Sequence, residues 1–127
     1  MKTLLLITYL FICSMVIGQS SQIIGKSIKI GRLEIAQNDF PDGMMWNQAK
    51  KACAGLGKGW RLPTKNEFNL LYKNKDKIGG FNVQHYYWCG TETGEYSAWK
   101  LNFYDGRAED WSGAKSNEFR VRAVRSF

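Results

Sequence analysis

The sequence predicts an α+β domain, with an early strand, two helices and then several antiparallel strands. The run MMWNQAKKACAGLG (residues 44–57) and the segment after Pro63 place apolar side chains at helical spacing. The later runs YYWCGTE, SAWKLNFYDGR and FRVRAVRSF are short, rich in aromatic and β-branched residues, and separated by turn formers. Helices grouped ahead of a run of strands are typical of this class.

The first 18 residues have the pattern of a secretory signal peptide. Lys2 precedes an uncharged apolar run, Leu4–Ile17, which is followed by Gly18 and a polar stretch. The run is short for a membrane span, and Cys13 follows a bulky residue, unlike a lipid-anchored cysteine. We expect an exported protein, periplasmic, surface-bound or released, with no membrane span after cleavage.

Residues 19–34 are expected to form a loose N-terminal leader and a first strand, and residues 35–127 to form the single domain. IKIGRLEIA (residues 28–36) alternates well enough for one strand or a bent pair. DFPDG (residues 39–43) then predicts a turn.

The two helices meet at an unusual junction, GKGWRLPTKNEF. The first helix carries an apolar stripe of Met45, Ala49, Ala52, Cys53 and Leu56 and ends at a glycine-rich turn. At the second helix, Thr64 and Glu67 form a capping box, and Pro63 precedes the cap. Arg61 could be a catalytic or a structural cation, and the structural role is favoured because no nucleophile or base lies nearby in sequence. The residues assigned to the scaffold are Trp46, Trp60, Arg61, Pro63, Thr64, Glu67, Trp88 and Trp99.

Two cysteines remain after Gly18, and they leave two alternatives open. In an exported chain Cys53 and Cys89 could form one disulfide, or each could be a small buried hydrophobic residue. With one histidine, His85, and no zinc-like spacing, we expect no metal site.

In the last third of the chain, strand alternation predicts which side chains face the core and which face outward. Trp99, Leu101 and Phe103 share the face expected in the core, and Lys100, Asn102 and Tyr104 share the outward face. The YDG sequence at residues 104–106 predicts a hairpin turn.

These ordered motifs resemble one family. From about Ile35 to Phe127, the chain is similar to the C-terminal domain family of the Legionella collagen-like adhesin. The motifs that carry the resemblance are the first-helix run with WRLPT, then YYWCGTE, AWKLNFYDG and VRAVRSF. The resemblance implies a C-type-lectin-like fold: two helices packed on a twisted antiparallel sheet with a long loop region. Relatives serve as variable proteins of diversity-generating retroelements, with ligand contacts on the last strands and loops.

The chain departs from the family pattern at several points. It has YWCGTE where YWSSTE is usual, and Ala123 stands where some members have a cysteine, so no bridge reaches the last strand. The calcium-binding triplets of true C-type lectins do not occur, so no calcium or other cofactor is expected. The adhesins present this domain as trimers, but no collagen repeat precedes it here, so an oligomer is open and a trimer is not implied.

The function expected is a non-catalytic, calcium-independent binding module for an acidic or glycan ligand or a surface protein. The formal net charge of +7 favours an acidic polysaccharide or surface protein, although mild basicity could simply aid solubility, and export argues against nucleic acid. The expected ligand-binding residues are Tyr104, Arg107, Trp111, Lys115, Arg120 and Arg122. The alternatives are a structural subunit of a surface complex or, less favoured, an enzyme of the sulfatase-modifying type, for which no redox cysteine pair is evident.

Overall fold

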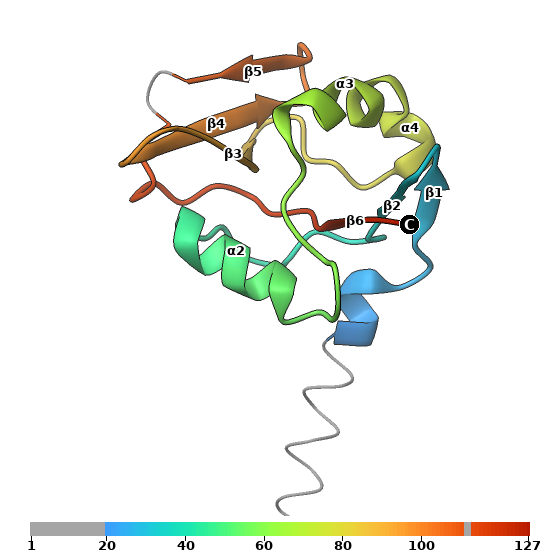
Figure 1. The fold of residues 1–127 in the computed structure, drawn as a ribbon. Coiled ribbons are helices and arrows are strands. Elements are labelled where there is room, and N and C mark those ends of the chain that lie inside the picture. Colours follow the sequence, from blue (N-terminus) through green and yellow to red (C-terminus); the bar gives the residue numbers. More distant parts are fainter. Residues whose placement is uncertain (1–19, 111–112) are drawn as a thin grey trace, which may run out of the picture.

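A computed structural model describes residues 20–110 and 113–127 (Figure 1). The expected signal peptide, residues 1–18, and the expected contact residue Trp111 lie outside this part of the chain. Residues 20–24 are helical. The elements that follow are β1 (Ile28–Ile30), β2 (Leu33–Ile35), α2 (Trp46–Ala54), α3 (Lys65–Lys73), α4 (Lys75–Ile78), β3 (Tyr86–Gly94), β4 (Ser97–Asn102), β5 (Arg107–Glu109) and β6 (Val124–Ser126).

The strands form two antiparallel three-stranded sheets, ordered β1-β2-β6 and β3-β4-β5. The segment 28–36 therefore forms a bent pair of strands, β1 and β2, rather than one continuous strand. Ile35 lies opposite Val124, so the start and end of the domain share one sheet. The residues expected to be a leader contribute to the fold as well, because Ile23 is buried and β1 pairs with β2.

Helices α2 and α3 pack on opposite faces of β3 and β4 (Figure 1). Trp46, Ala49 and Cys53 of α2 share one buried cluster with Trp88 and Ala98. A second cluster joins Phe68 and Leu71 of α3 to Tyr87, Leu101 and Phe103. The core is thus divided by the β3–β4 pair, which is apolar on both sides where the helices cover it.

The helix junction is built as the sequence predicts. Thr64 Oγ1 accepts from the Glu67 N–H at 3.2 Å, and Glu67 Oε1 accepts from the Thr64 N–H at 2.9 Å, which confirms the capping box. Arg61 adds a two-pronged ion pair to Glu67, with both N–O distances 2.8 Å. Pro63 is fully buried, and Trp60 is 4% exposed beneath the Arg125 guanidinium.

Trp99 differs from its expected place in the core. Leu101 and Phe103 are buried as predicted, but Trp99 is only half-buried. Its ring packs against the edge of the α3-side cluster and lies 3.8 Å from Lys65 Nζ. The α3 helix begins at Lys65, so at this end of β4 the covering side chain is a lysine rather than an apolar residue.

Candidate functional site

The β3-β4-β5 sheet carries a row of polar residues beyond the part covered by α2. Tyr86 lies opposite Asn102, which lies opposite Arg107. Facing residues of neighbouring strands point the same way, and side chains two apart along a strand share a face. Lys100 and Glu109 therefore join them. We call the five residues Tyr86, Lys100, Asn102, Arg107 and Glu109 the polar sheet face.

Lys100 is the centre of this face, and the expectation that it points to solvent is wrong. Its side chain is 4% exposed and its Nζ lies 4.0 Å from the centre of the Tyr86 ring. Glu109 Oε2 lies 3.9 Å from the same Nζ and accepts no hydrogen bond from the described residues. Hydrogen bonding to Glu109, with some burial, raises the pKa of the Tyr86 phenol. The cation is thus neutralised within the face and is not presented to a ligand.

A polar pocket of about 350 Å³ opens beside Tyr86. The Tyr86 and Phe119 rings, whose centres are 5.7 Å apart, line it and also approach Lys100. The remaining lining residues are Gly43, Gln84, His85, Glu118 and Arg120. Arg120 forms no ion pair with any described residue. The pocket therefore offers an available cation next to two aromatic rings.

The β4–β5 turn, at the other end of the row, presents the two most exposed of the expected contact residues that the structure describes. Tyr104 is 76% exposed, and the Arg107 side chain is 75% exposed with only a 3.9 Å approach to Asp105. Asn102 Oδ1 accepts from the Tyr104 N–H at 2.8 Å. Gly106 has φ of +78°, and a Cβ there would lie 2.7 Å from the Tyr72 ring. The turn is held tightly against α3, so its outward side chains start from a fixed backbone.

The expected ligand-binding residues are only partly brought together. Tyr104 and Arg107 lie at one end of the row, and Arg120 lines the pocket at the other. Neighbouring strands are about 4.8 Å apart, so Tyr86 and Arg107 are separated by roughly 10 Å across the sheet. Lys115 lies elsewhere: its ammonium is 2.7 Å from Glu92 and stacks 4.3 Å from the Trp46 ring. It has partners within the fold already.

Arg122 does not face outward, and that expectation is wrong. Its side chain is 2% exposed and its Nε lies 2.6 Å from Asp39 Oδ1. Its guanidinium also donates to the Ala36 and Gly79 carbonyls. Tyr87 donates to the other Asp39 oxygen. Alternation failed here because the segment around Arg122 is covered on both sides, by an apolar cluster and by a polar network.

The cysteines take the second of their two alternatives. Cys53 and Cys89 are free, buried thiols, and they belong to different clusters on opposite sides of β3. Burial raises the pKa of Cys53 to about 12 and also raises that of Cys89. Both are therefore protonated and inert at neutral pH. Within residues 20–110 and 113–127, no three His, Cys, Asp or Glu side chains gather in a way that could hold a metal ion.

Sequence reasoning missed the pocket beside Tyr86. From the sequence, His85 is only a histidine without metal-ligand spacing, and Tyr86 is only part of the strand-like run YYWCGTE. The available signal was the pair Tyr86–Tyr87 ahead of Trp88, since adjacent strand residues must point to opposite faces. Only one of the two tyrosines can therefore point into the α3-side core. Tyr87 does so, and Tyr86 lines the pocket.

Solved structures with the same architecture are found at low sequence identity. Botrocetin has a TM-score of 0.62 at 10% identity, and EMS16, an antagonist of the collagen receptor integrin α2β1, has 0.58 at 10%. Botrocetin in complex with a von Willebrand factor A1 domain gives 0.54 at 12%. Each match covers 81% of this chain and 98% of the other. The fold is therefore C-type-lectin-like.

A family model settles the closer kinship. No curated protein sequence matches the chain, and no helix among the described residues is long and apolar enough to cross a membrane. The model of the Lcl C-terminal domain matches residues 25–125. This confirms the resemblance seen in the sequence, and the match starts ten residues before the expected boundary at residue 35 because it takes in the β1–β2 pair. The chain belongs to the Lcl C-terminal domain family.

Proposed function

We propose that this domain is an exported, non-catalytic module that binds an acidic glycan without calcium. The observation that carries the proposal is a surface that runs from the pocket at Arg120, across the polar sheet face, to the β4–β5 turn at Arg107. We call this surface the Arg107–Arg120 row. It has an available arginine at each end and exposed or pocket-lining tyrosine rings beside both, Tyr86 and Tyr104. The separation of roughly 10 Å between Tyr86 and Arg107 across the sheet suits an extended chain of sugar rings rather than a single small anion.

The chemistry of the row matches the two demands of such a ligand. Aromatic rings give flat apolar area for the faces of sugar rings, and guanidinium groups form two-pronged hydrogen bonds with carboxylate and sulfate oxygens. The backbone beneath is fixed by the Asn102 hydrogen bond and by the close approach of Gly106 to Tyr72. A preformed surface loses less entropy on binding.

Catalysis has less support than binding. The carboxylate on this face, Glu109, is paired with Lys100, and the cysteines are buried and protonated. A general acid or base must reach a substrate proton within hydrogen-bond distance. Neither Glu109 nor Lys100 is accessible enough for that in this structure.

A surface protein is the second candidate partner. Its support is the fold: botrocetin is seen in complex with a von Willebrand factor domain, and EMS16 antagonises an integrin. A protein partner would make the exposed Tyr104 a central anchor, because tyrosine and arginine are enriched among residues that dominate interface energies.

A glycan array at two salt concentrations tests the proposal, followed by titration of the best acidic polysaccharide. We expect Arg107→Ala and Arg120→Ala each to weaken binding and to reduce its dependence on salt, because screening acts on the charge that has been removed. Arg32→Ala is the matched control, since Arg32 is exposed on the other sheet, in the β1–β2 turn. A chelator should change nothing. Calcium-dependent binding, or equal losses in all three variants, would contradict the proposal.

A further inference from the structure

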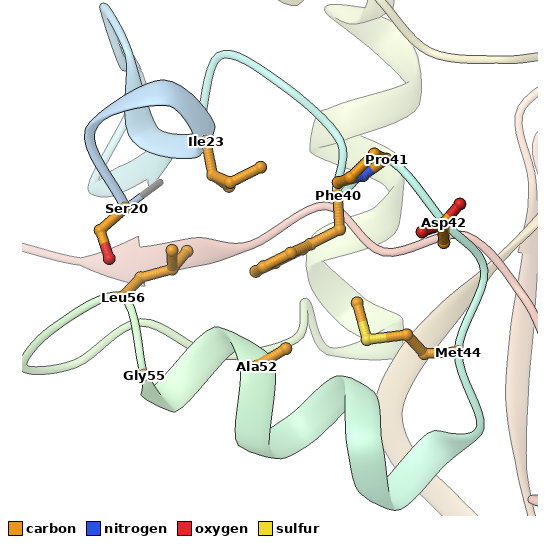
Figure 2. Close-up of a pocket in the computed structure, with 9 residues that line it drawn as sticks. All are labelled: Ser20, Ile23, Phe40, Pro41, Asp42, Met44, Ala52, Gly55 and Leu56. Carbon is orange, nitrogen blue, oxygen red and sulfur yellow. The ribbon is translucent and has the colours of Figure 1, made fainter. Parts of the chain in front are cut away.

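A second, apolar pocket lies between the N-terminal helical turn, the 40–44 loop and the C-terminal half of α2 (Figure 2). It has a volume of about 400 Å³. We propose that it binds a small organic amine with an aryl or alkyl group. The hydrocarbon group fills the pocket, and the ammonium group contacts the Asp42 carboxylate at the rim. Its apolar lining includes Ile23, Phe40, Met44, Ala52 and Leu56.

The walls of the pocket are held without a ligand. The Asn38 N–H donates to the Ile23 carbonyl at 3.1 Å, and the Asn38 amide donates to the Gln22 carbonyl at 2.7 Å, so the helical turn is tied to the chain ahead of the loop. The loop is fixed by Phe40 N–H to Val121 O at 3.0 Å and Met44 N–H to Phe119 O at 2.9 Å. The volume is therefore preformed, as in most small-molecule sites.

The lining favours a hydrocarbon group of about one ring and a short chain. A volume of about 400 Å³ is within the usual range for ligand pockets. Figure 2 shows the Phe40 ring projecting between Ile23 and Ala52, with Met44 and Leu56 on either side. The binding free energy gained from such an apolar surface is largest when an apolar group of the ligand covers it and removes it from water. Methionine at position 44 can adapt to the shape of the guest.

The sign of the ligand's charge follows from Asp42. Among the described residues that line the pocket, Asp42 is the one ionisable residue, and Ser20 is the one other residue with a polar side chain. Asp42 is exposed and forms no ion pair with any described residue. A carboxylate at the rim attracts a cation and repels an anion, so this pocket has the opposite preference to the Arg107–Arg120 row.

Three probes of one size separate charge from shape: phenethylamine, 2-phenylethanol and phenylacetate. Each would be titrated into the purified full chain, followed by NMR with nuclear Overhauser contacts to the Met44 methyl group. We expect the amine to bind about two- to fivefold more tightly than the alcohol, the range of an exposed ion pair, and phenylacetate to bind weakest. Asp42→Asn should make the amine and the alcohol equal.

Ala52→Phe should fill the pocket and abolish binding of both the amine and the alcohol. Asn47→Phe is the matched control, because Asn47 is an exposed position of the same helix that does not line the pocket. If Ala52→Phe does not fold, the Met44 contacts in the unaltered chain still decide the matter. The proposal is overturned if no probe contacts Met44, if phenylacetate binds as well as the amine, or if a folded Ala52→Phe protein binds like the Asn47→Phe control. These outcomes are independent of the glycan experiments.

Discussion

Two arginines that the sequence analysis assigns to the same binding surface have opposite surroundings, Arg122 in the interior and Arg107 at the β4–β5 turn. Arg122 is 2% exposed, with its guanidinium bonded to Asp39 and to two carbonyl groups. The Arg107 side chain is 75% exposed, with one distant carboxylate, Asp105. The difference shows that the partners around an arginine, rather than its residue type, decide whether it belongs to the scaffold or is an available surface charge.

Arg61 is an intermediate case. It is partly exposed, yet its ion pair with Glu67 reinforces the capping box of α3, and it donates to the Ser126 hydroxyl of β6. It therefore belongs with the scaffold. The GKGWRLPTKNEF junction thus has a structural role, because Arg61 connects the start of α3 to the last strand, β6.

The largest effect is expected at Arg122. Arg122→Ala leaves the Asp39 carboxylate without its ion-pair partner, and breaking a buried pair typically costs about 3–5 kcal/mol of unfolding free energy. Urea denaturation would measure it. The double variant Asp39→Asn, Arg122→Met should lose less than the sum of the single variants, since no unpaired charge remains. A loss for Arg122→Ala below about 0.5 kcal/mol would place this arginine with the surface charges.

Trp60 should give a loss of similar or slightly smaller size. Trp60 is 4% exposed and belongs to the α2-side cluster, so Trp60→Ala should cost about 3–5 kcal/mol. Trp99→Ala is the matched control, and we expect a smaller loss because Trp99 is half-buried. Melting temperatures that fall equally in the two variants would contradict the assignment of Trp60 to the scaffold.

The fold was largely predictable because its signals are local. The capping box at Thr64, the glycine that ends α2 and the YDG turn each depend on residues within a few positions of one another. The failures have a non-local cause. Lys100 in β4 and Arg122 ahead of β6 follow an alternation in the sequence that predicts exposure. The Phe119 ring and the Asp39 carboxylate, both from distant segments, nevertheless cover them.

The candidate site was predicted only in part for the same reason. Tyr104 and Arg107 are contiguous with a turn that the sequence identifies, so their exposure could be inferred. The pocket at Arg120 could not, because its lining comes from three separated segments around residues 43, 84–86 and 118–120. Periodicity describes the face of one strand, whereas a pocket depends on which strands meet.

A moderate effect is expected at the N-cap of α3. Thr64→Ala removes the oxygen that accepts from the Glu67 N–H, which should cost about 1 kcal/mol of unfolding free energy. Thr64→Ser keeps the acceptor and serves as the control. If chemical denaturation gives the same stability for the alanine and serine variants, the cap contributes nothing here.

The same junction should make stability depend on acid. Burial alone would raise the pKa of Glu67, but hydrogen bonds from Arg61 and from the Thr64 N–H lower it below the ordinary 4.5. A carboxyl whose pKa is lowered in the folded state stabilises above its unfolded value, and that contribution disappears as the pH falls through the folded value. The stability gap between the unaltered protein and Glu67→Gln should therefore narrow from pH 7 to pH 3 in denaturation curves. A gap that widens toward low pH would contradict this assignment.

The smallest effect on stability is expected at Arg107, where the comparison with Arg122 is sharpest. Arg107→Ala removes a charge that has no close partner, and exposed charges contribute little to folding. The melting temperature should stay within about 2–4 °C of the unaltered protein, since surface changes are usually within about 0.5 kcal/mol and a domain of this size shifts by roughly 4–8 °C per kcal/mol. Affinity for an acidic polysaccharide should nevertheless fall, and fall most at low salt, where the lost charge is least screened. Calorimetry and binding on the same preparation separate the two readouts. A variant that loses stability but keeps its affinity would assign Arg107 to the scaffold with Arg122, and the binding surface would then have to be sought away from the β4–β5 turn.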